Sequence, residues 1–252
     1  MTLEVCVDSL ASARIAAEYG AARIELNSAL ELGGLTPSVG LVEQVVACLG
    51  PLRCQVIAMV RPRPGGFAYN GDELTVMQRD IDHLVNAGVD GIALGVLASD
   101  SSVDVSANRN LFKPIAAAGK DLVFHRAFDL TPDPIASLDC LIELGFTRVL
   151  TSGQAPTAME GAAVIRRLIE HAQGRIEVLP GSGVTTANVA TLLNATGCKQ
   201  VHATLRQLLD DPSGSLRPAI QFSSLPPKNG AYSQADPDKI KAMVAALQSN
   251  QR

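Results

Sequence analysis

The sequence has no long hydrophobic run and no recognisable secretory signal. Its longest apolar stretches, such as Val56–Val60, have the length of a β-strand and are far too short to span a bilayer. Residues Met1–Glu4 enter a strand pattern directly, without the basic segment and apolar core of a signal peptide. We therefore expect a cytoplasmic protein that does not associate with membranes.

Clusters of positive charge are also missing. The chain carries 21 Lys and Arg against 25 Asp and Glu, which gives a net charge of −4 and a pI near 5.6. The basic residues are scattered, so no stripe of them could neutralise a run of phosphates along a duplex. This distribution argues against nucleic acid as a partner.

Cysteine pairs with metal-binding spacing do not occur either. There is no CxxC motif, which argues against a structural zinc site. The cysteines are odd in number, widely spaced and surrounded by apolar residues, and we expect them to be reduced thiols. They are Cys6, Cys48, Cys54, Cys140 and Cys198.

What the sequence does contain is a repeated unit. An amphipathic helical pattern, a glycine, a few residues and a short β-branched run recur along the chain, as at Gly20 before Arg23–Leu26. Each glycine stands where a helix ends and the backbone must turn left-handed. The spacing between these glycines is that of one βα unit. They are Gly20, Gly50, Gly88, Gly119, Gly145, Gly174 and Gly197.

These breaks separate eight predicted strands, with helices between them. The strands are predicted at Leu3–Val7, Arg23–Leu26, Cys54–Val60, Gly91–Leu94, Leu122–His125, Val149–Thr151, Glu177–Leu179 and Gln200–Ala203, and helices at Ser9–Tyr19, Gly71–Ala87, Pro134–Leu144, Met159–Gln173 and Thr186–Asn194. Buried strands joined by crossover helices form a parallel sheet, and eight units favour a closed (β/α)₈ barrel, or TIM barrel, over an open doubly wound sheet. We expect residues 1–252 to form one domain.

The end of the chain does not follow this repeated βα pattern. Residues 207–236 are rich in Ser, Pro, Gly and Asp, and we expect an irregular segment there, followed by a last helix at 237–249. A loop of this length in a compact barrel is usually functional or an oligomer contact. A non-catalytic oligomeric scaffold is therefore one alternative function, and it would need this segment to form most of an intersubunit surface and the mouth of the barrel to be occluded.

Polar residues gather where the predicted strands end. In a parallel barrel the carboxyl ends of the strands converge on one mouth, where ligands bind. His125 is a candidate general acid or base or metal ligand there, with Glu25 or Asp129 to orient it. The alternative for His125 is a packed, hydrogen-bonded core residue. His202, late in the last strand, is a candidate ligand-binding residue.

Three arginines are candidates for binding an anion. Arg61 and Arg63 flank a proline and precede two glycines, which predicts an extended segment that aims forked guanidinium groups at a carboxylate or phosphate. Arg126 follows His125 at the same mouth. The alternative is that the loop arginines are solvated or paired with carboxylates.

Glycine-rich turns follow the sixth and seventh strands. Gly181, Ser182 and Gly183, together with Ser152 and Gly153 from the preceding unit, allow backbone N–H groups to approach an anion. The other interpretation is that these glycines only make tight turns. A small phosphorylated or carboxylated metabolite is the partner that the first interpretation predicts.

Cys6 ends the first strand and is the candidate metal ligand. A thiolate is a soft ligand that suits copper(I). The alternative is that Cys6 is a small buried hydrophobic residue. No nucleophile–base–acid triad and no nucleotide-binding motif is recognisable from spacing.

At these residues the chain resembles the CutC family of copper homeostasis proteins. The resemblance covers most of the chain and is carried by Glu4–Ser9, Gly33–Ser38, Arg61–Arg63, Phe124–Asp129, Leu150–Gly153 and Leu179–Gly183. It implies a cytoplasmic (β/α)₈ barrel that forms a homodimer or a larger homo-oligomer. It also implies a role in the control of copper homeostasis.

The resemblance further implies copper binding by two cysteines at the ends of the first and second strands. Cys6 matches the first of these, but Asn27 stands at the second position. Copper(I) prefers two or three soft ligands, so we expect weak or nonstoichiometric binding completed by Met59, His125 or a second chain. The alternative function is an enzyme acting on a small anionic metabolite, because arginines, histidine and glutamate converge on one predicted mouth.

Overall fold

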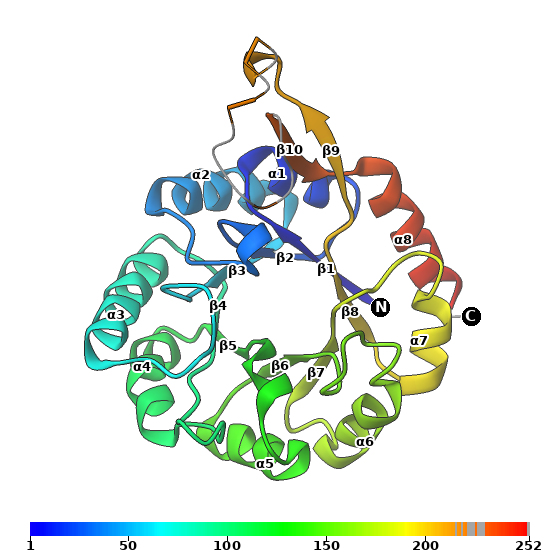
Figure 1. Cartoon of the computed structure of the whole chain (residues 1–252). Helices are drawn as coiled ribbons and strands as arrows, with labels where there is room; N and C mark the ends of the chain where they lie inside the picture. The colour runs from blue at the N-terminus through cyan, green and yellow to red at the C-terminus, as the bar shows by residue number, and fades with distance from the viewer. Residues whose placement is uncertain (215, 218, 221–224, 226–229, 251–252) are drawn as a thin grey trace.

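Eight parallel strands form the centre of the molecule, and helices surround them (Figure 1). The computed structural model describes residues 1–214, 216–217, 219–220, 225 and 230–250. The strands pair in the order β7-β6-β5-β4-β3-β2-β1-β8, and β7 and β8 lie beside one another, so the barrel is nearly closed. The predicted TIM barrel is confirmed, and the alternative of an open doubly wound sheet is wrong.

The observed strand bounds lie within two residues of the predicted ones. The strands are β1 (Thr2–Val7), β2 (Arg23–Leu26), β3 (Gln55–Met59), β4 (Gly91–Leu94), β5 (Asp121–Phe124), β6 (Arg148–Thr151), β7 (Glu177–Pro180) and β8 (Gln200–Ala203). β5 ends before His125, which was predicted to belong to it. The backbone of His125 leaves the strand because its side chain caps the short 3₁₀ helix η3 (Arg126–Leu130) that follows.

Six of the eight α-helices in the described part of the chain begin at a side-chain cap that the sequence supplies, and α6 and α7 do not. The helices are α1 (Leu10–Glu18), α2 (Val39–Leu49), α3 (Gly71–Asn86), α4 (Val105–Ala117), α5 (Pro134–Leu144), α6 (Ala162–Ala172), α7 (Val189–Thr196) and α8 (Pro237–Ser249), with further 3₁₀ turns η1 (Leu30–Leu32), η2 (Gly50–Leu52) and η4 (Pro212–Gly214). At α3, Asn70 and Glu73 cap each other's backbone N–H groups in a capping box. None of the described helices is long and apolar enough to cross a membrane.

The glycines predicted to end helices in a left-handed turn do so with one exception. Gly20, Gly88 and Gly145 have φ near +100°, +91° and +90° at the ends of their helices. Gly50 is instead helical, with φ of −49°, because the chain continues into η2. The left-handed turn there is made three residues later by Arg53, with φ of 53°.

The inside of the barrel is divided into an apolar and a polar part. Side chains alternate along each strand, so every second residue points inward. On β3, β4 and β5 the inward positions form a small apolar cluster of Ile57, Met59, Ala93 and Val123. On β1, β2 and β8 the inward positions carry polar and charged groups, which are buried all the same. The outward residues of all the strands pack under the helices in the main core.

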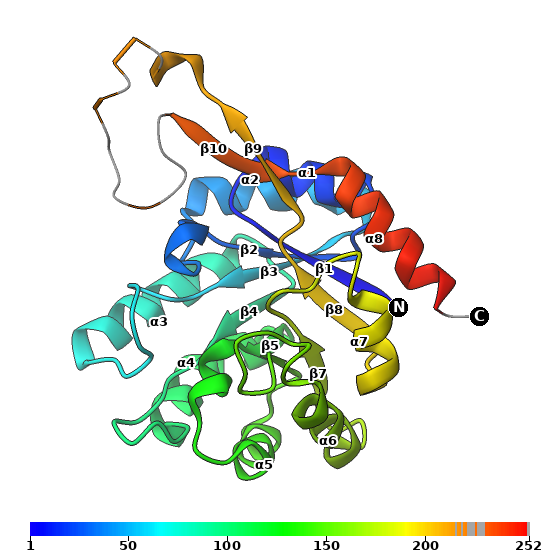
Figure 2. The same ribbon diagram turned by 45° about the vertical axis from the view of Figure 1, so that its right-hand side comes forward.

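The segment 207–236, which was expected to be irregular, contains a hairpin. β9 (Arg206–Asp210) pairs antiparallel with β10 (Ala231–Ala235), and the hairpin projects from the barrel beside α1 (Figure 2). The prediction was wrong because each strand is short and half-polar, and the Ser, Pro and Gly between them dominate the composition. Part of that connection, residues 215, 218, 221–224 and 226–229, lies outside the described residues.

One close backbone contact fixes the loop between β6 and α6. A Cβ atom on Gly161 would lie 1.9 Å from the carbonyl oxygen of Ser152 and 2.9 Å from Cα of Gly153. Gly161 has φ of −86°, a conformation that any residue adopts. The requirement for glycine at this position therefore comes from space alone.

We predict that Gly161→Ala lowers the free energy of unfolding by about 1–3 kcal/mol, the usual cost of overpacking. The matched control is Gly40→Ala in the first turn of α2, where a Cβ meets nothing within 4 Å. This change should leave stability unchanged or raise it by up to about 1 kcal/mol. Urea unfolding of both variants measures the difference, and equal stabilities would contradict the close contact.

Candidate functional site

The carboxyl ends of the strands surround a cavity of about 540 Å³. Eight of the candidate catalytic, ligand-binding and metal-binding residues line it, and so does Met59, which was expected to complete a copper site; the eight are Cys6, Glu25, Arg61, His125, Arg126, Ser182, Gly183 and His202. The other five, Arg63, Asp129, Ser152, Gly153 and Gly181, do not. The mouth of the barrel is therefore one continuous cavity, and fewer of the candidate residues line it than the sequence predicted.

Arg61 is buried on one wall of this cavity, and no carboxylate in the described part of the chain pairs with it. It is 7% exposed, and its Nη1 donates to the carbonyl oxygens of Leu32 and Gly34 at 3.1 and 3.0 Å. Nη2 donates to the carbonyl of Gly65 at 2.8 Å, whereas Nε is buried and finds no acceptor among the described residues. A guanidinium has five N–H donors. Arg61 therefore keeps its positive charge uncompensated and retains donors for a ligand.

His125 lies next to Arg61 and is held as a neutral imidazole. Both side chains contact Phe67, whose ring centroid lies 5.1 Å from the guanidinium and 4.8 Å from the imidazole. Burial, together with the positive charge of Arg61, lowers the pKa of His125 to about 3. Nδ1 accepts a hydrogen bond from the backbone N–H of Ala127 at 3.2 Å, which assigns the proton to Nε2.

This tautomer changes the role predicted for His125. Nε2 is buried and has no acceptor among the described residues, so His125 offers a neutral N–H donor rather than a base. The expected orientation by a carboxylate is wrong, because a backbone amide rather than Glu25 or Asp129 holds the ring. Phe67, which the sequence analysis missed, supports the ring from the side.

Asp129 lies behind the cavity and organises the loop after β6. Its oxygens accept from the hydroxyls of Thr151 and Ser152 and from the backbone N–H groups of Ser152 and Gln154. It also pairs with Arg126 at 2.8 Å, and Arg126 in turn donates to the Ser152 hydroxyl. The carboxylate predicted to be catalytic is thus occupied by structural hydrogen bonds.

Arg63 points away from the cavity. It pairs with Glu73 of α3, donates to the carbonyls of Gly66 and Ala68, and stacks 5.0 Å above the ring of Tyr69. For this arginine the alternative interpretation, a loop residue paired with a carboxylate, is correct. The two arginines of one motif therefore differ, since only Arg61 lines the cavity.

The turn after β7 offers backbone donors to the cavity. Ser182 and Gly183 both have left-handed φ values, 83° and 68°. The N–H groups of Ser182, Gly183 and Val184 donate to no acceptor in the described part of the chain. Gly181 keeps this turn close to β8, because a Cβ there would lie 2.7 Å from Leu150 and 3.3 Å from His202. Such a run of free N–H groups suits an anion.

A second group of polar side chains lies on the wall made by β1 and β2. The amide of Asn27 donates to Sγ of Cys6 at 3.3 Å and to Oε2 of Glu25 at 3.0 Å. The Cys6 thiol also donates to Glu25 at 3.6 Å. Burial and the charge of Glu25 raise the pKa of the Cys6 thiol well above its usual value, so the thiol stays protonated. Burial also raises the pKa of Glu25.

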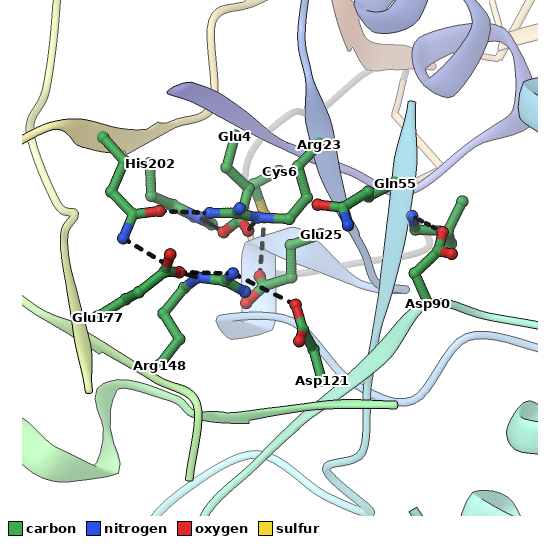
Figure 3. Close-up of polar contacts among 12 residues, drawn as sticks. Glu4, Cys6, Arg23, Glu25, Gln55, Asp90, Asp121, Arg148, Glu177 and His202 are labelled. Atoms are coloured by element: carbon green, nitrogen blue, oxygen red, sulfur yellow. Dashed lines mark hydrogen bonds and ion pairs between the residues drawn. The ribbon is translucent and has the colours of Figure 1, made fainter. Parts of the chain in front are cut away.

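His202 joins this wall from β8 and is bound to a buried carboxylate, as Figure 3 shows. Its Nδ1 lies 2.7 Å from Glu4, which also pairs with Arg23. Burial by itself favours a neutral ring, but the hydrogen bond to Glu4 and the charges of Glu25 and Glu4 raise the pKa of His202. The hydrogen bond and the charges of Arg23 and His202 outweigh burial and lower the pKa of Glu4 to about 2.

Glu4 and Arg23 were missed by the sequence analysis, although a signal for them exists. Each stands two positions before a residue that was singled out, Cys6 and Glu25 respectively. Residues two apart on a strand point to the same side. Polar residues at such positions were therefore to be expected inside the barrel.

We predict that His125 makes the protein less stable in mild acid. Unfolded chains protonate His125 near pH 6.5, whereas the folded protein keeps it neutral down to about pH 3. The unfolded state binds more protons between these values, so the free energy of unfolding falls by up to about 1.4 kcal/mol per pH unit as pH drops. Urea unfolding of His125→Gln should show a shallower pH dependence than the unmodified protein. The control variant His83→Gln, at an exposed position of α3, should keep the pH dependence of the unmodified protein.

The chain has relatives along nearly its whole length. The model of the CutC family matches residues 1–207. A protein from Treponema denticola named family protein CutC is 42% identical over 246 residues, which cover 97% of this chain and 98% of that protein. A copper homeostasis protein cutC homolog from Homo sapiens is 43% identical over 210 residues, covering 82% of this chain and 74% of the human protein.

Solved structures agree with these matches. The crystal structure of CutC from Streptococcus agalactiae superposes with a TM-score of 0.77 at 38% identity, covering 81% of this chain and 98% of that one. A 3-hexulose-6-phosphate synthase from Salmonella typhimurium, 16% identical with a TM-score of 0.60, shares the fold alone. The family resemblance drawn from the sequence motifs is confirmed, and this chain belongs to the CutC family.

Proposed function

We propose that the cavity binds a small phosphorylated or carboxylated metabolite and that the protein acts on it as an enzyme. The observation that carries this proposal is Arg61, a buried guanidinium on the cavity wall without a carboxylate partner among the described residues. Burial of an unpaired charge is costly, and carbonyl dipoles offset that cost only in part. An anionic ligand would supply the missing negative charge.

The other arginines that line the cavity differ from Arg61 because each lies close to a carboxylate. Arg126 is neutralised by Asp129 at 2.8 Å, and Arg206 lies 3.5 Å from Glu31. Arg61 is thus the cavity-lining arginine whose charge is left for a ligand. The free N–H groups of Ser182 and Gly183 add donors to the same space, and they favour the same sign of ligand charge.

We predict that Arg61→Met weakens the binding of dihydroxyacetone phosphate or pyruvate by about 10- to 100-fold. This is the usual contribution of one charge-assisted hydrogen-bonded contact. Isothermal titration calorimetry measures it, with uncharged dihydroxyacetone as the ligand control. Arg63→Met removes the neighbouring arginine outside the cavity and should leave affinity unchanged. Equal losses in both variants, or no binding of either anion by the unmodified protein, would contradict the proposal.

A role in the control of copper homeostasis is the second candidate function. The family and its human member's name support it, and so does a buried cluster of Cys6, Glu25 and His202, whose ligand atoms lie within 4.8 Å of one another. These partners differ from Met59 and His125, which were expected to complete the copper site. One protonated thiol with an imidazole and a hard carboxylate fits copper(I) poorly. We therefore propose weak copper(I) binding.

We predict that Asn27→Cys strengthens copper(I) binding at least tenfold. The Asn27 amide already contacts the Cys6 sulfur at 3.3 Å, so a thiol at position 27 completes a two-thiolate pair. Competition against a copper(I) chelator measures the affinity, and Asn27→Ala serves as the control without a thiol. Tight one-to-one binding by the unmodified protein that disappears in Cys6→Ala would show that the present ligands suffice.

A further inference from the structure

The polar wall of the cavity brings together three side chains that differ in the kind of metal-ligating atom they carry. Cys6 and Glu25 are register partners in the parallel pair of β1 and β2, and His202 comes from β8 on the other side of β1. One ligand atom from each lies within 4.8 Å of the others, and all three residues line the cavity (Figure 3). We propose that these side chains hold a divalent ion of borderline softness, such as zinc(II), rather than copper(I). The proposal goes beyond the binding of an anionic metabolite and does not depend on it.

The separation of Cys6 and Glu25 suits a shared ion. Zinc(II) lies about 2.3 Å from a cysteine sulfur and about 2.1 Å from a carboxylate oxygen, with tetrahedral angles between its ligands. By this geometry the two ligand atoms are about 3.6 Å apart. Sγ of Cys6 and Oε2 of Glu25 lie 3.6 Å from one another. Both atoms can therefore bind one ion while the strands that carry them stay in place.

His202 is oriented in the way that metal-binding histidines are. A histidine that binds a metal through one ring nitrogen usually donates the other N–H to a carboxylate, which fixes the ring and its tautomer. Glu4 lies 2.7 Å from Nδ1 of His202, and Arg23 anchors Glu4 in turn. Nε2 has no hydrogen-bond partner among the residues that the structure describes. It is therefore the nitrogen left for an ion.

Asn27 supports the other two ligands from behind the cavity wall. Its amide donates to Sγ of Cys6 at 3.3 Å and to Oε2 of Glu25 at 3.0 Å, and Asn27 does not itself line the cavity. Hydrogen bonds of this kind orient metal ligands and stabilise the negative charge of a thiolate or a carboxylate. Each of the three proposed ligands thus has a further side chain that fixes its position.

The charges of the cluster favour a divalent ion over copper(I). Glu25 is 4% exposed and forms no ion pair within the described part of the chain, whereas the buried Glu4 has Arg23. When the ion binds, the Cys6 thiol loses its proton to solvent, because a coordinated thiol is deprotonated. The thiolate and the carboxylate then carry two negative charges. Zinc(II) neutralises both, whereas copper(I) would leave one buried charge unpaired.

The number of ligands identifies the class of site. Structural zinc sites are closed by four protein ligands, whereas catalytic ones have three and keep a position open for water or substrate. Among the described residues no fourth His, Cys, Asp or Glu joins the cluster of Cys6, Glu25 and His202. The site is therefore of the open class, and its free position is reached from the cavity that Arg61 also lines.

Titration of the full-length protein with cobalt(II), after dialysis against EDTA, tests the site. Cobalt(II) replaces zinc(II) in such sites and reports a thiolate ligand by a charge-transfer absorption in the near ultraviolet. We expect one equivalent of cobalt(II) to produce this band in the unmodified protein and Cys6→Ala to abolish it. Cys198→Ala removes a buried cysteine outside the cluster and should keep the band. Thermal unfolding of the metal-free variants shows that each is folded.

The variant Glu25→Gln distinguishes zinc(II) from copper(I). It removes the charge of the hard ligand and should weaken zinc(II) binding, measured by competition with a chromophoric chelator, by at least about tenfold. At saturating cobalt(II) its charge-transfer band should still form, because the thiolate remains. Its affinity for copper(I) should not change, since a soft ion gains little from a carboxylate.

Several outcomes would overturn the proposal. These are failure of the unmodified protein to bind zinc(II), cobalt(II) binding without the charge-transfer band, and zinc(II) affinity that is equal in Glu25→Gln. Losses of zinc(II) and copper(I) affinity that are equal in Glu25→Gln would also do so, because they would show that one site serves both ions alike. None of these results touches the anion site at Arg61 when anion binding is measured on the same metal-free protein.

Discussion

The structure depends on the hydrogen-bonded ion pair that Glu4 makes inside the barrel. Glu4 is 1% exposed and binds both Arg23 and His202, so it connects β1 to the strands on either side of it. A carboxylate at this depth is tolerable only because the charge of Arg23 and the hydrogen bonds with Arg23 and His202 replace the water it loses. The same contacts fix the His202 ring, and with it one wall of the cavity.

The ion pair belongs to a longer chain of polar contacts. Arg23 donates to Gln200, and Gln200 lies 3.5 Å from Glu177. Glu177 pairs with Arg148, which also contacts Asp121 (Figure 3). This chain fills the amino-terminal end of the barrel, where many parallel barrels place branched apolar residues. The apolar cluster around Ile57 and Met59 fills only the opposite side. One side of the barrel interior is therefore apolar, and on the other side polar side chains extend from the amino-terminal ends of the strands to the cavity at their carboxyl ends.

The fold could be predicted because its signals are local. Glycines such as Gly88 and Gly145 end helices in a left-handed turn, and buried four-residue runs such as Arg23–Leu26 follow them. The site was harder to predict because it depends on which side chains satisfy one another in space. Arg61 and Arg63 share one motif, yet Glu73 holds only Arg63. Asp129 stands four residues after His125, yet it binds the neighbouring loop instead of the imidazole. No spacing rule distinguishes such partners.

Arg206 belongs to two parts of the molecule at once. It lines the cavity, and it is also the first residue of β9, which leads into the projecting hairpin. Its guanidinium lies 3.5 Å from Glu31 of η1, while its backbone carbonyl accepts a hydrogen bond from Lys239 of α8. Arg206 therefore joins the projecting hairpin, α8 and the wall of the cavity through the contacts of a single residue.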